Sequence, residues 1–569
     1  MPSLSHRVLF LVGILAVSLP LVASPQVFAK NESSASGGGM INYLKPQKNG
    51  YLNQSQDRVI KKKAFNLKNL PTGVGAINPE LGFFAIVPPD KLADADYAES
   101  LLSNDKVNGL SCAFAWNTLE PSEEKFNFDP IDKVLAACNR HHKTLILRVV
   151  ASGLADGGQD SVDGTPKWVF DGGTKSISFH AADGSSHTMP VFWDKNYLAK
   201  WSNFIAELAD HYDKNPTIHS IGITGGGFGI GTGIMPETAD KKSSDVAEML
   251  KHQYNMNDRQ LVEHWKYVAD IFPKRFQTAR LNFNINAPVN GKTGEEALDE
   301  IADYLVYRYG ERVYLTRSGL KDGKHSWDDY RLLLKFHKDT LTGIRVADTM
   351  SAQEFPKAAK HALDDGISFA EMPAALLTSA DPAMQSALSE LSSHIGYELV
   401  NQKASIPNTV PAGQALKASF EFVNAGAAPA MRPERNMDKD AAMSYRVQIE
   451  LRNADGKPVL QNVHTPPAWT SSWEPGKPVA WDEQLKMIDA EKHQLPPGEY
   501  SVWMSVVDPA QKRKIQFLHA TSDGKMTSAE TVELGKLTIT ASVAATPPAP
   551  VAETPQNQAA GAPPEEVKH

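Results

Sequence analysis

Between residues 72 and 398, short apolar runs alternate with longer segments that repeat apolar residues every three or four positions. The helical period is clearest in residues 197–212, where one face carries Leu198, Trp201, Phe204, Ile205 and Leu208. The apolar runs are 81–89, 109–116, 144–150, 218–224, 279–286, 312–317, 342–348 and 367–372. Eight strand-then-helix units predict the α/β class and a (β/α)8 TIM barrel, because parallel neighbours need helical crossovers and eight strands close around a filled interior. An open, doubly wound sheet is the alternative.

From residue 399 the apolar positions recur with a period of two. In the run 445–452, Tyr445, Val447, Ile449 and Leu451 alternate with polar residues, and a turn-forming Asn-Ala-Asp-Gly sequence follows. Three more runs alternate in the same way, with Pro and Gly between them. Residues 399–542 are therefore predicted to form a C-terminal antiparallel β-sandwich of immunoglobulin-like architecture.

Both ends of the chain have a composition that does not predict a packed domain. Residues 1–29 carry Arg7, then an apolar stretch, then small residues that end at Ala29, which predicts a signal peptide removed on export. An uncleaved anchor is the alternative, although the apolar stretch is short for a bilayer span. Residues 30–71 are expected to be a flexible lead-in, and residues 543–569 a disordered Pro/Ala-rich tail. The protein is thus expected to be secreted or periplasmic, within the cell envelope, without a stable membrane span after signal cleavage.

Composition narrows the range of partners. The formal charge of -8 and the pI of about 6.1 provide no broad basic surface, so no nucleic-acid partner is expected. With Cys112 and Cys138 as the two cysteines, a cysteine-based metal site is not expected, and the pair is either one disulfide or two buried thiols. No cofactor and no metal are predicted, since the Gly-rich segment 225–231 lacks the spacing of a phosphate-binding loop.

The carboxyl ends of the barrel strands are the places to search for chemistry, because the loops after them converge above the filled interior. After the second predicted strand the sequence shows a Trp, a Glu-Pro pair, two spaced aromatics and an Asp that opens a helix. These residues are Trp116, Glu120, Pro121, Phe126, Phe128 and Asp132. Together with Arg148 and the run 189–225, this stretch resembles the glycoside hydrolases with β-galactosidase-like and cellulase-like barrels. The resemblance implies a carbohydrate substrate.

Several residues are candidates for contacts with a sugar. Tryptophan faces pack against sugar rings, and arginine and asparagine offer directed hydrogen bonds. The candidates are Trp116, Arg148, Trp168, Trp193, Asn286 and Arg317. For each tryptophan, packing at the barrel rim is the alternative, and for Arg148 a supporting role.

Glycoside cleavage needs two carboxyl groups, one as acid and one as nucleophile or base. Glu371, at the end of the eighth strand, is the candidate nucleophile or base, and Asp348, at the end of the seventh, is the next. The resemblance implies an acid just after the fourth strand, but the sequence there is Gly-rich, so Glu237 a few residues later and Glu120 are the candidate acids. The protein is therefore predicted to bind and hydrolyse glycosidic bonds. The alternatives are that Glu371 is paired with Arg317 or Arg345 as scaffold, and that the protein is a non-catalytic carbohydrate-binding or envelope-structural protein.

Overall fold

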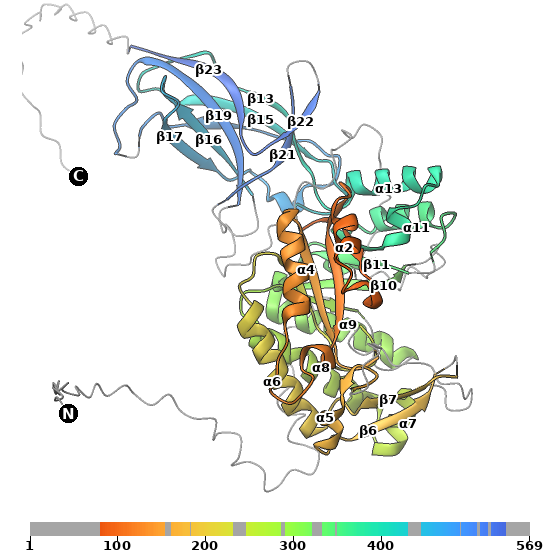
Figure 1. Ribbon diagram of the computed structural model, residues 1–569. Coiled ribbons are helices and arrows are strands. Elements are labelled where there is room, and N and C mark those ends of the chain that lie inside the picture. The colour runs from red at the N-terminus through yellow and green to blue at the C-terminus, as the bar shows by residue number, and fades with distance from the viewer. Residues whose placement is uncertain are drawn as a thin grey trace, which may run out of the picture. The chain divides into compact units, whose positions relative to one another are not determined.

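Eight parallel strands hydrogen-bond in a closed ring in the computed structural model (Figure 1). They are β1 (Gly82–Ile86), β2 (Val107–Ala115), β3 (Thr144–Val150), β8 (Ile218–Gly222), β9 (Leu281–Asn284), β10 (Val313–Leu320), β11 (Thr342–Val346) and β12 (Phe369–Pro373). Each predicted run overlaps one of these strands, so the barrel is confirmed. The open-sheet alternative is wrong, because β1 pairs with both β2 and β12 and leaves no edge.

The structure describes residues 80–153, 161–181, 184–230, 246–285, 291–320, 333–347, 350–430, 445–489, 491–508, 513–521 and 525–541. The predicted signal peptide, the lead-in and the tail lie outside these ranges. Within them, no helix is both long and apolar enough to cross a membrane.

The helices between the strands follow the predicted apolar periodicity. They are α2 (Ala95–Leu102), α3 (Trp116–Leu119), α4 (Asp129–Arg140), α5 (Lys167–Asp171), α6 (Lys195–Tyr212), α7 (Val246–Tyr254), α8 (Asp258–Arg275), α9 (Gly291–Tyr309), α11 (Phe355–Asp364), α12 (Ala374–Leu377) and α13 (Pro382–His394). In α6, Asp194 caps the amino terminus by accepting hydrogen bonds from two backbone N–H groups, and the predicted apolar face is buried.

The barrel interior contains an aromatic layer and a polar layer. The rings of Phe84, His219, Tyr314 and Phe369 lie against one another, with centroid separations from 4.4 to 6.1 Å. Gly343 leaves room for this layer, because a Cβ there would lie 2.4 Å from the Phe369 ring. The polar layer begins two residues farther along the strands and contains the candidate site.

Two small antiparallel ribbons are inserted between β3 and α6. They are β4 (Ser161–Val162) with β5 (Thr165–Pro166), and β6 (Ser176–His180) with β7 (Ser186–Pro190). Both ribbons follow the carboxyl end of β3, which places them on the side of the barrel where active sites of this fold lie.

Two sheets follow the barrel, one in the order β18-β15-β13-β21-β22 and the other β14-β23-β19-β16-β17, with β20 beside β19. Their strands are β13 (Leu399–Ser405), β14 (Thr409–Pro411), β15 (Leu416–Asn424), β16 (Arg446–Arg452), β17 (Pro458–His464), β18 (Val479–Leu485), β19 (Gly498–Asp508), β20 (Arg513–Ile515), β21 (Phe517–Ala520), β22 (Met526–Ala529) and β23 (Val532–Thr540). The expected alternating strands are present. The sheets are mixed rather than wholly antiparallel, because β13 runs parallel to β21 and β14 to β23. The immunoglobulin-like arrangement stays a prediction.

Both cysteines are free thiols in buried positions, Cys112 in β2 and Cys138 in α4. Burial raises the pKa of both thiols, that of Cys138 to about 12. The structure therefore favours the two-thiol alternative over the disulfide, and neither group is activated as a nucleophile.

Candidate active site

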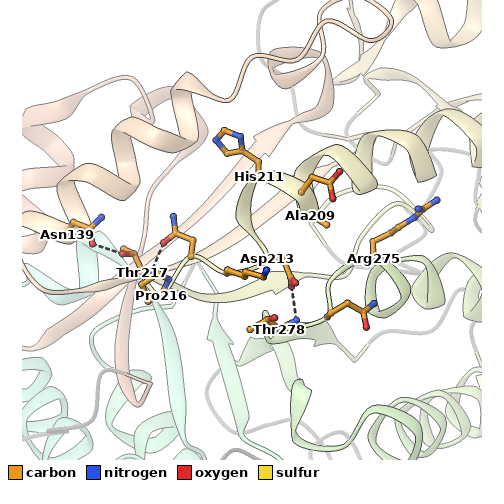
Figure 2. A pocket seen from close by; sticks show the side chains of 12 residues that line it. Asn139, Ala209, His211, Asp213, Pro216, Thr217, Arg275 and Thr278 are labelled. Atoms are coloured by element: carbon orange, nitrogen blue, oxygen red, sulfur yellow. Dashed lines mark hydrogen bonds between the residues drawn. The ribbon is translucent and has the colours of Figure 1, made fainter. Parts of the chain in front are cut away.

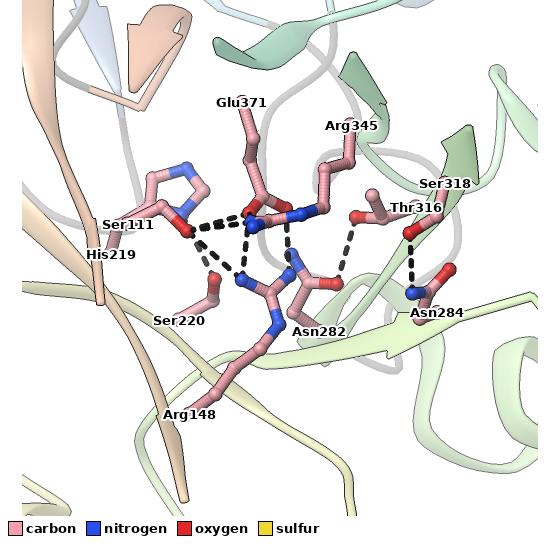
Figure 3. A network of polar contacts seen from close by, with 10 residues as sticks. All are labelled: Ser111, Arg148, His219, Ser220, Asn282, Asn284, Thr316, Ser318, Arg345 and Glu371. Carbon is pink, nitrogen blue, oxygen red and sulfur yellow. Dashed lines mark hydrogen bonds and ion pairs between the residues drawn. The ribbon is translucent and has the colours of Figure 1, made fainter. Parts of the chain in front are cut away.

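A buried carboxylate, Glu371 on β12, lies in the polar layer of the barrel (Figure 3). Arg148 on β3 donates two parallel hydrogen bonds to it, from Nη2 to Oε1 at 2.6 Å and from Nη1 to Oε2 at 2.7 Å. A bidentate pair of this kind fixes the plane of the carboxylate as well as its position. Gly222 on β8 makes room for the arginine, because a Cβ there would lie 2.4 Å from the Arg148 Cγ.

Arg345 and Ser111 contact the same carboxylate. Arg345 Nη1 donates to Oε2 of Glu371 at 2.9 Å, and Ser111 Oγ donates to that oxygen at 2.6 Å. The Arg345 side chain is 17% exposed and that of Arg148 is 2% exposed, so Arg345 lies on the solvent side of the cluster. Both oxygens of Glu371 are therefore engaged by donors from three other strands.

The two guanidinium groups set the protonation state of Glu371. Burial alone raises the pKa of this carboxyl, but the charges of Arg148 and Arg345 and the hydrogen bonds from Arg148 and Ser111 outweigh burial and lower the pKa to about 2. Glu371 is thus an anion at any ordinary pH. It can act as a nucleophile or a base, but not as a general acid.

Neutral polar side chains extend the layer along β9 and β10. Thr316 Oγ1 donates to Asn282 Oδ1 at 2.8 Å, and Asn284 Nδ2 donates to Ser318 Oγ at 2.6 Å. In the described residues, Asn282 Nδ2 and Asn284 Oδ1 are buried without a hydrogen-bond partner. Buried amide groups normally have partners, so this wall of the barrel is suited to an ordered water or a ligand hydroxyl.

Glu120 lies in a different environment, directly after α3. Its carboxylate accepts a hydrogen bond from Trp116 Nε1 at 2.8 Å and one from the Glu124 N–H at 2.9 Å. Burial raises the pKa of Glu120 to about 7, and the hydrogen bonds only partly oppose that shift. Near neutral pH a large fraction of Glu120 is therefore protonated, as a general acid requires.

The three candidate tryptophans differ in what covers their rings. Trp116 is completely buried and packs edge-on against Trp168 and Trp201, with centroid separations of 5.8 and 5.0 Å. Trp193 is half-buried and stacks on His264 at 5.3 Å. Trp168 is half-buried, with Lys200 Nζ 4.6 Å from its ring centroid. Trp116 offers no exposed face to a ligand, whereas Trp168 and Trp193 are partly accessible.

A family model matches the first half of the barrel. Residues 90–269 match Glyco_hydro_42, the β-galactosidase family model. This segment begins in the turn before α2 and runs through β2, β3 and β8 into α8, and it contains Glu120 and Arg148 but not Glu371. The predicted resemblance to glycoside hydrolases is confirmed over this segment.

Solved structures of glycoside hydrolases are similar to the chain at low sequence identity. The catalytic domain of a β-amylase from Paenibacillus polymyxa is 12% identical with a TM-score of 0.41, and the match covers 56% of this chain and 98% of that one. A GH42 β-galactosidase from G. stearothermophilus is 12% identical with a TM-score of 0.36, and a β-galactosidase from Rahnella sp. R3 is 13% identical with a TM-score of 0.35. The chain spans 57% of each β-galactosidase. No match was found among curated proteins.

The remaining predicted site residues are placed as follows. Glu237, Asp348 and Asn286 lie outside the described residues. Arg317 donates from Nη1 to the backbone oxygen of Ile285 at 2.7 Å. Of the two arginines considered as partners for Glu371, Arg345 is the one that bonds to it. The catalytic and sugar-binding roles of all these residues stay predictions.

Sequence reasoning overlooked five members of the polar layer, which are Ser111, Asn282, Asn284, Thr316 and Ser318. The available signal was a polar residue at an inward position of an apolar strand, which is costly to bury unless it is hydrogen-bonded. Asn282 and Asn284 alternate with apolar residues in β9, so a period of two was visible there.

A groove of about 790 Å³, drawn in Figure 2, shares none of its lining residues with the polar layer. It is lined by the end of α6, the segment before β8 and the segment between α8 and β9. Asp213 holds these segments together by accepting hydrogen bonds from the backbone N–H groups of Thr278 at 2.8 Å and Ala279 at 2.9 Å. The groove precedes the amino ends of β8 and β9, where residues of this fold serve stability rather than catalysis.

Proposed function

We propose that this protein binds an oligo- or polysaccharide at the mouth of its barrel and hydrolyses glycosidic bonds. The match of residues 90–269 to the β-galactosidase model, on a closed eight-stranded barrel, carries the proposal. The carboxylate in the barrel interior supports it, because a sugar-cleaving barrel requires a fixed anion near the carboxyl ends of its strands.

Of the four candidate catalytic carboxyl groups, Glu371 and Glu120 lie in described residues, and their protonation states suit opposite roles. The pKa of Glu371 is about 2 and that of Glu120 is about 7, so at neutral pH the first is ionised and the second is partly protonated. We assign Glu371 as nucleophile or base and Glu120 as candidate acid, with Glu237 the alternative acid and Asp348 the alternative nucleophile. An attack by Glu371 through Oε2 requires that oxygen to lose its donors, which are Arg345, the more exposed of the two arginines, Arg148 and Ser111.

Replacing Glu371 by Gln is expected to reduce glycoside hydrolysis by at least about 1,000-fold, because the amide cannot act as nucleophile or base. Purified protein is assayed against aryl glycosides and natural oligosaccharides, with the melting temperature of each variant recorded. Glu99→Gln is the matched control, since Glu99 is also paired with an arginine but lies on α2, and it should keep full activity. Full activity in a folded Glu371→Gln variant removes Glu371 from the mechanism.

If Glu120 is the acid, hydrolysis by the native protein declines above about pH 7, and Glu120→Gln abolishes that dependence.

Binding without turnover is the second candidate function. The observation that favours it is that both oxygens of Glu371 are engaged and the side chain is 0% exposed. In this case calorimetry detects saccharide binding to the native protein, no glycoside is cleaved, and Glu371→Gln affects stability more than affinity.

We further propose that the protein is exported to the periplasm or beyond. The support is the order of features in residues 1–29, where a charged residue is followed by an apolar stretch and then by small residues. The expected amino terminus of the mature protein is Lys30, as read by mass spectrometry of protein purified from its native host. A mature chain that begins at residue 1 or 2 and is recovered with the cytosol contradicts export.

A further inference from the structure

A chain of hydrogen bonds joins a serine, a histidine and an aspartate on the ribbons that follow β3. Ser185 Oγ lies 2.6 Å from His187 Nε2, and His187 Nδ1 lies 2.8 Å from Asp163 Oδ1. The serine and the aspartate thus contact opposite nitrogens of one imidazole ring. This is the connectivity of a serine hydrolase triad, which is recognised by geometry rather than by order along the chain.

The direction of each hydrogen bond follows from the groups themselves. An ionised carboxylate can only accept, so His187 Nδ1 carries the proton that bonds to Asp163. In the neutral imidazole Nε2 then has a lone pair, and the Ser185 hydroxyl donates to it. This tautomer, with the proton on Nδ1, is the one in which His187 can accept the serine proton.

Asp163 is held in place by contacts independent of His187. Its second carboxylate oxygen accepts a hydrogen bond from the Thr188 N–H at 2.7 Å, and its backbone oxygen accepts one from the Gly153 N–H at 2.7 Å. Its φ of 51° is the left-handed conformation that the two-residue Asp163-Gly164 turn between β4 and β5 requires. The aspartate is thus pre-positioned to orient the imidazole.

The three residues are accessible to solvent and lie on the mouth side of the barrel. The side chains of His187 and Asp163 are 24% and 19% exposed, and Ser185 is half-buried. Among the described residues, an added Cβ at the neighbouring Gly184 would meet nothing within 4 Å. The His187 ring also contacts Phe228 at 5.2 Å, in the segment after the carboxyl end of β8.

We propose that Ser185, His187 and Asp163 form a second hydrolytic site, which cleaves carboxylic esters. Ser185 Oγ attacks the carbonyl carbon while its proton passes to His187 Nε2, and the C–O bond to the alcohol breaks as His187 returns that proton to the leaving oxygen. Water then attacks the acyl carbon and gives up one proton to His187. The bond between that carbon and Ser185 Oγ breaks as His187 returns the proton to Oγ, which releases the carboxylic acid. The net reaction consumes one ester and one water, and it releases one acid and one alcohol.

The alcohol half of the ester is assigned as a saccharide, and this part rests on the proposed function of the barrel. Sugars that carry small O-acyl groups, such as acetyl, fit a site in which Phe179 and Phe228 surround the imidazole at 5.6 and 5.2 Å. Removing such groups beside the barrel mouth would expose hydroxyls for recognition by the glycosidase site.

Ser185→Ala in the full-length chain tests the proposal, and Ser186→Ala is its matched control. Ser186 Oγ also contacts a histidine, His180 Nδ1 at 3.0 Å, but no aspartate completes that pair in the described residues. Three quantities are measured: hydrolysis of 4-nitrophenyl acetate, covalent labelling by a fluorophosphonate, and acetate release from an acetylated oligosaccharide. Ser185→Ala is expected to lose labelling and at least about 100-fold of both ester activities, and Asp163→Asn to lose a similar factor. Ser186→Ala should remain within about twofold of the native protein.

The outcomes separate this site from the barrel site. Unchanged ester hydrolysis in folded Ser185→Ala, or a native protein that no fluorophosphonate labels, overturns the triad. Ser185-dependent cleavage of 4-nitrophenyl acetate without acetate release from the oligosaccharide overturns the saccharide assignment. Glycosidase activity is read separately as reducing ends, and Ser185→Ala should leave it unchanged, so failure of the glycosidase proposal is visible by itself.

Discussion

Replacing Arg148 by Met is expected to lower the free energy of unfolding by about 3 to 5 kcal/mol, as found when one partner of a buried ion pair is removed. Glu371 is 0% exposed and accepts two charged hydrogen bonds from Arg148, at 2.6 and 2.7 Å. Without Arg148, Oε1 loses that donor, and Arg345 alone must balance the charge. Urea denaturation at pH 7 measures the loss.

A surface ion pair provides the control for this substitution. Arg140 pairs with Glu99, and their side chains are 60% and 34% exposed. Arg140→Met removes the same charge at a solvated position and should cost no more than about 1 kcal/mol. If Arg148→Met also loses no more than about 1 kcal/mol of unfolding free energy, the Arg148–Glu371 pair does not have the structural role assigned to it. The double variant Arg148→Met/Glu371→Met should recover part of the loss, because it also removes the buried carboxylate, while Arg345 loses its bond to Glu371 at a position that is 17% exposed.

The acid side of the stability curve gives an independent test of the same pair. The pKa of Glu371 is depressed to about 2 in the folded protein, so its contribution to stability is complete above the unfolded value of 4.5. That contribution disappears as the pH falls from about 4.5 toward 2. In Arg148→Met the pKa of Glu371 rises, so this part of the acid-dependent loss should shrink relative to the native protein.

The barrel could be predicted from the sequence because its strands are covered on both faces. Such strands appear as continuous apolar runs, as in Thr144–Val150, where the predicted bounds coincide with β3. The helices between them are amphipathic and show a different period. The parallel pairing of β13 with β21 was not predictable, because the alternation in a strand shows which face is buried but not the direction of the neighbouring strand.

The site was only partly predictable, because its contacts join distant positions. Arg148 and Glu371 are separated by 223 residues, and closure of the barrel brings them together. Both residues could be identified because they lie near the ends of predicted strands. The bidentate contact between them depends on the three-dimensional arrangement of the strands, which the spacing of residues in the sequence does not give. The same holds for Ser185, which looks like Ser186 in the sequence and differs because the tight turn at Asp163 places a carboxylate behind His187.

Replacing Glu398 by Gln is expected to stabilise the protein at alkaline pH. Glu398 lies between α13 and β13, and its backbone is fixed there, with its N–H donating to Asn424 Oδ1 at 3.1 Å and its oxygen accepting from the Ala425 N–H at 2.8 Å. Glu398 is 4% exposed, and neither carboxylate oxygen has a hydrogen-bond partner in the described residues. Burial raises the pKa of Glu398 to about 8.

The sign of the effect follows from this raised pKa. Folding favours the neutral acid, so the stabilising contribution is present below the unfolded value of 4.5 and is lost as the pH rises through about 8. The native protein should therefore lose about 2 to 4 kcal/mol between pH 5 and pH 8.5 from this residue, since each pKa unit corresponds to about 1.4 kcal/mol. Glu398→Gln has no carboxyl to ionise and should show no such loss. At pH 8.5 it should be the more stable protein by about 2 kcal/mol or more.

Urea denaturation of the two proteins at pH 5, 7 and 8.5 measures this difference. Glu499→Gln is the control, because Glu499 is exposed on β19 and the same chemical change there should leave the native pH dependence in place. Equal pH dependence in the native protein and in Glu398→Gln would mean that the ionised Glu398 side chain reaches solvent or a cation. The junction between α13 and β13 would then have to open at alkaline pH, and a loss of protection of the Glu398 and Ala425 amides above pH 8, measured against the intrinsic exchange rate at each pH, would show that opening.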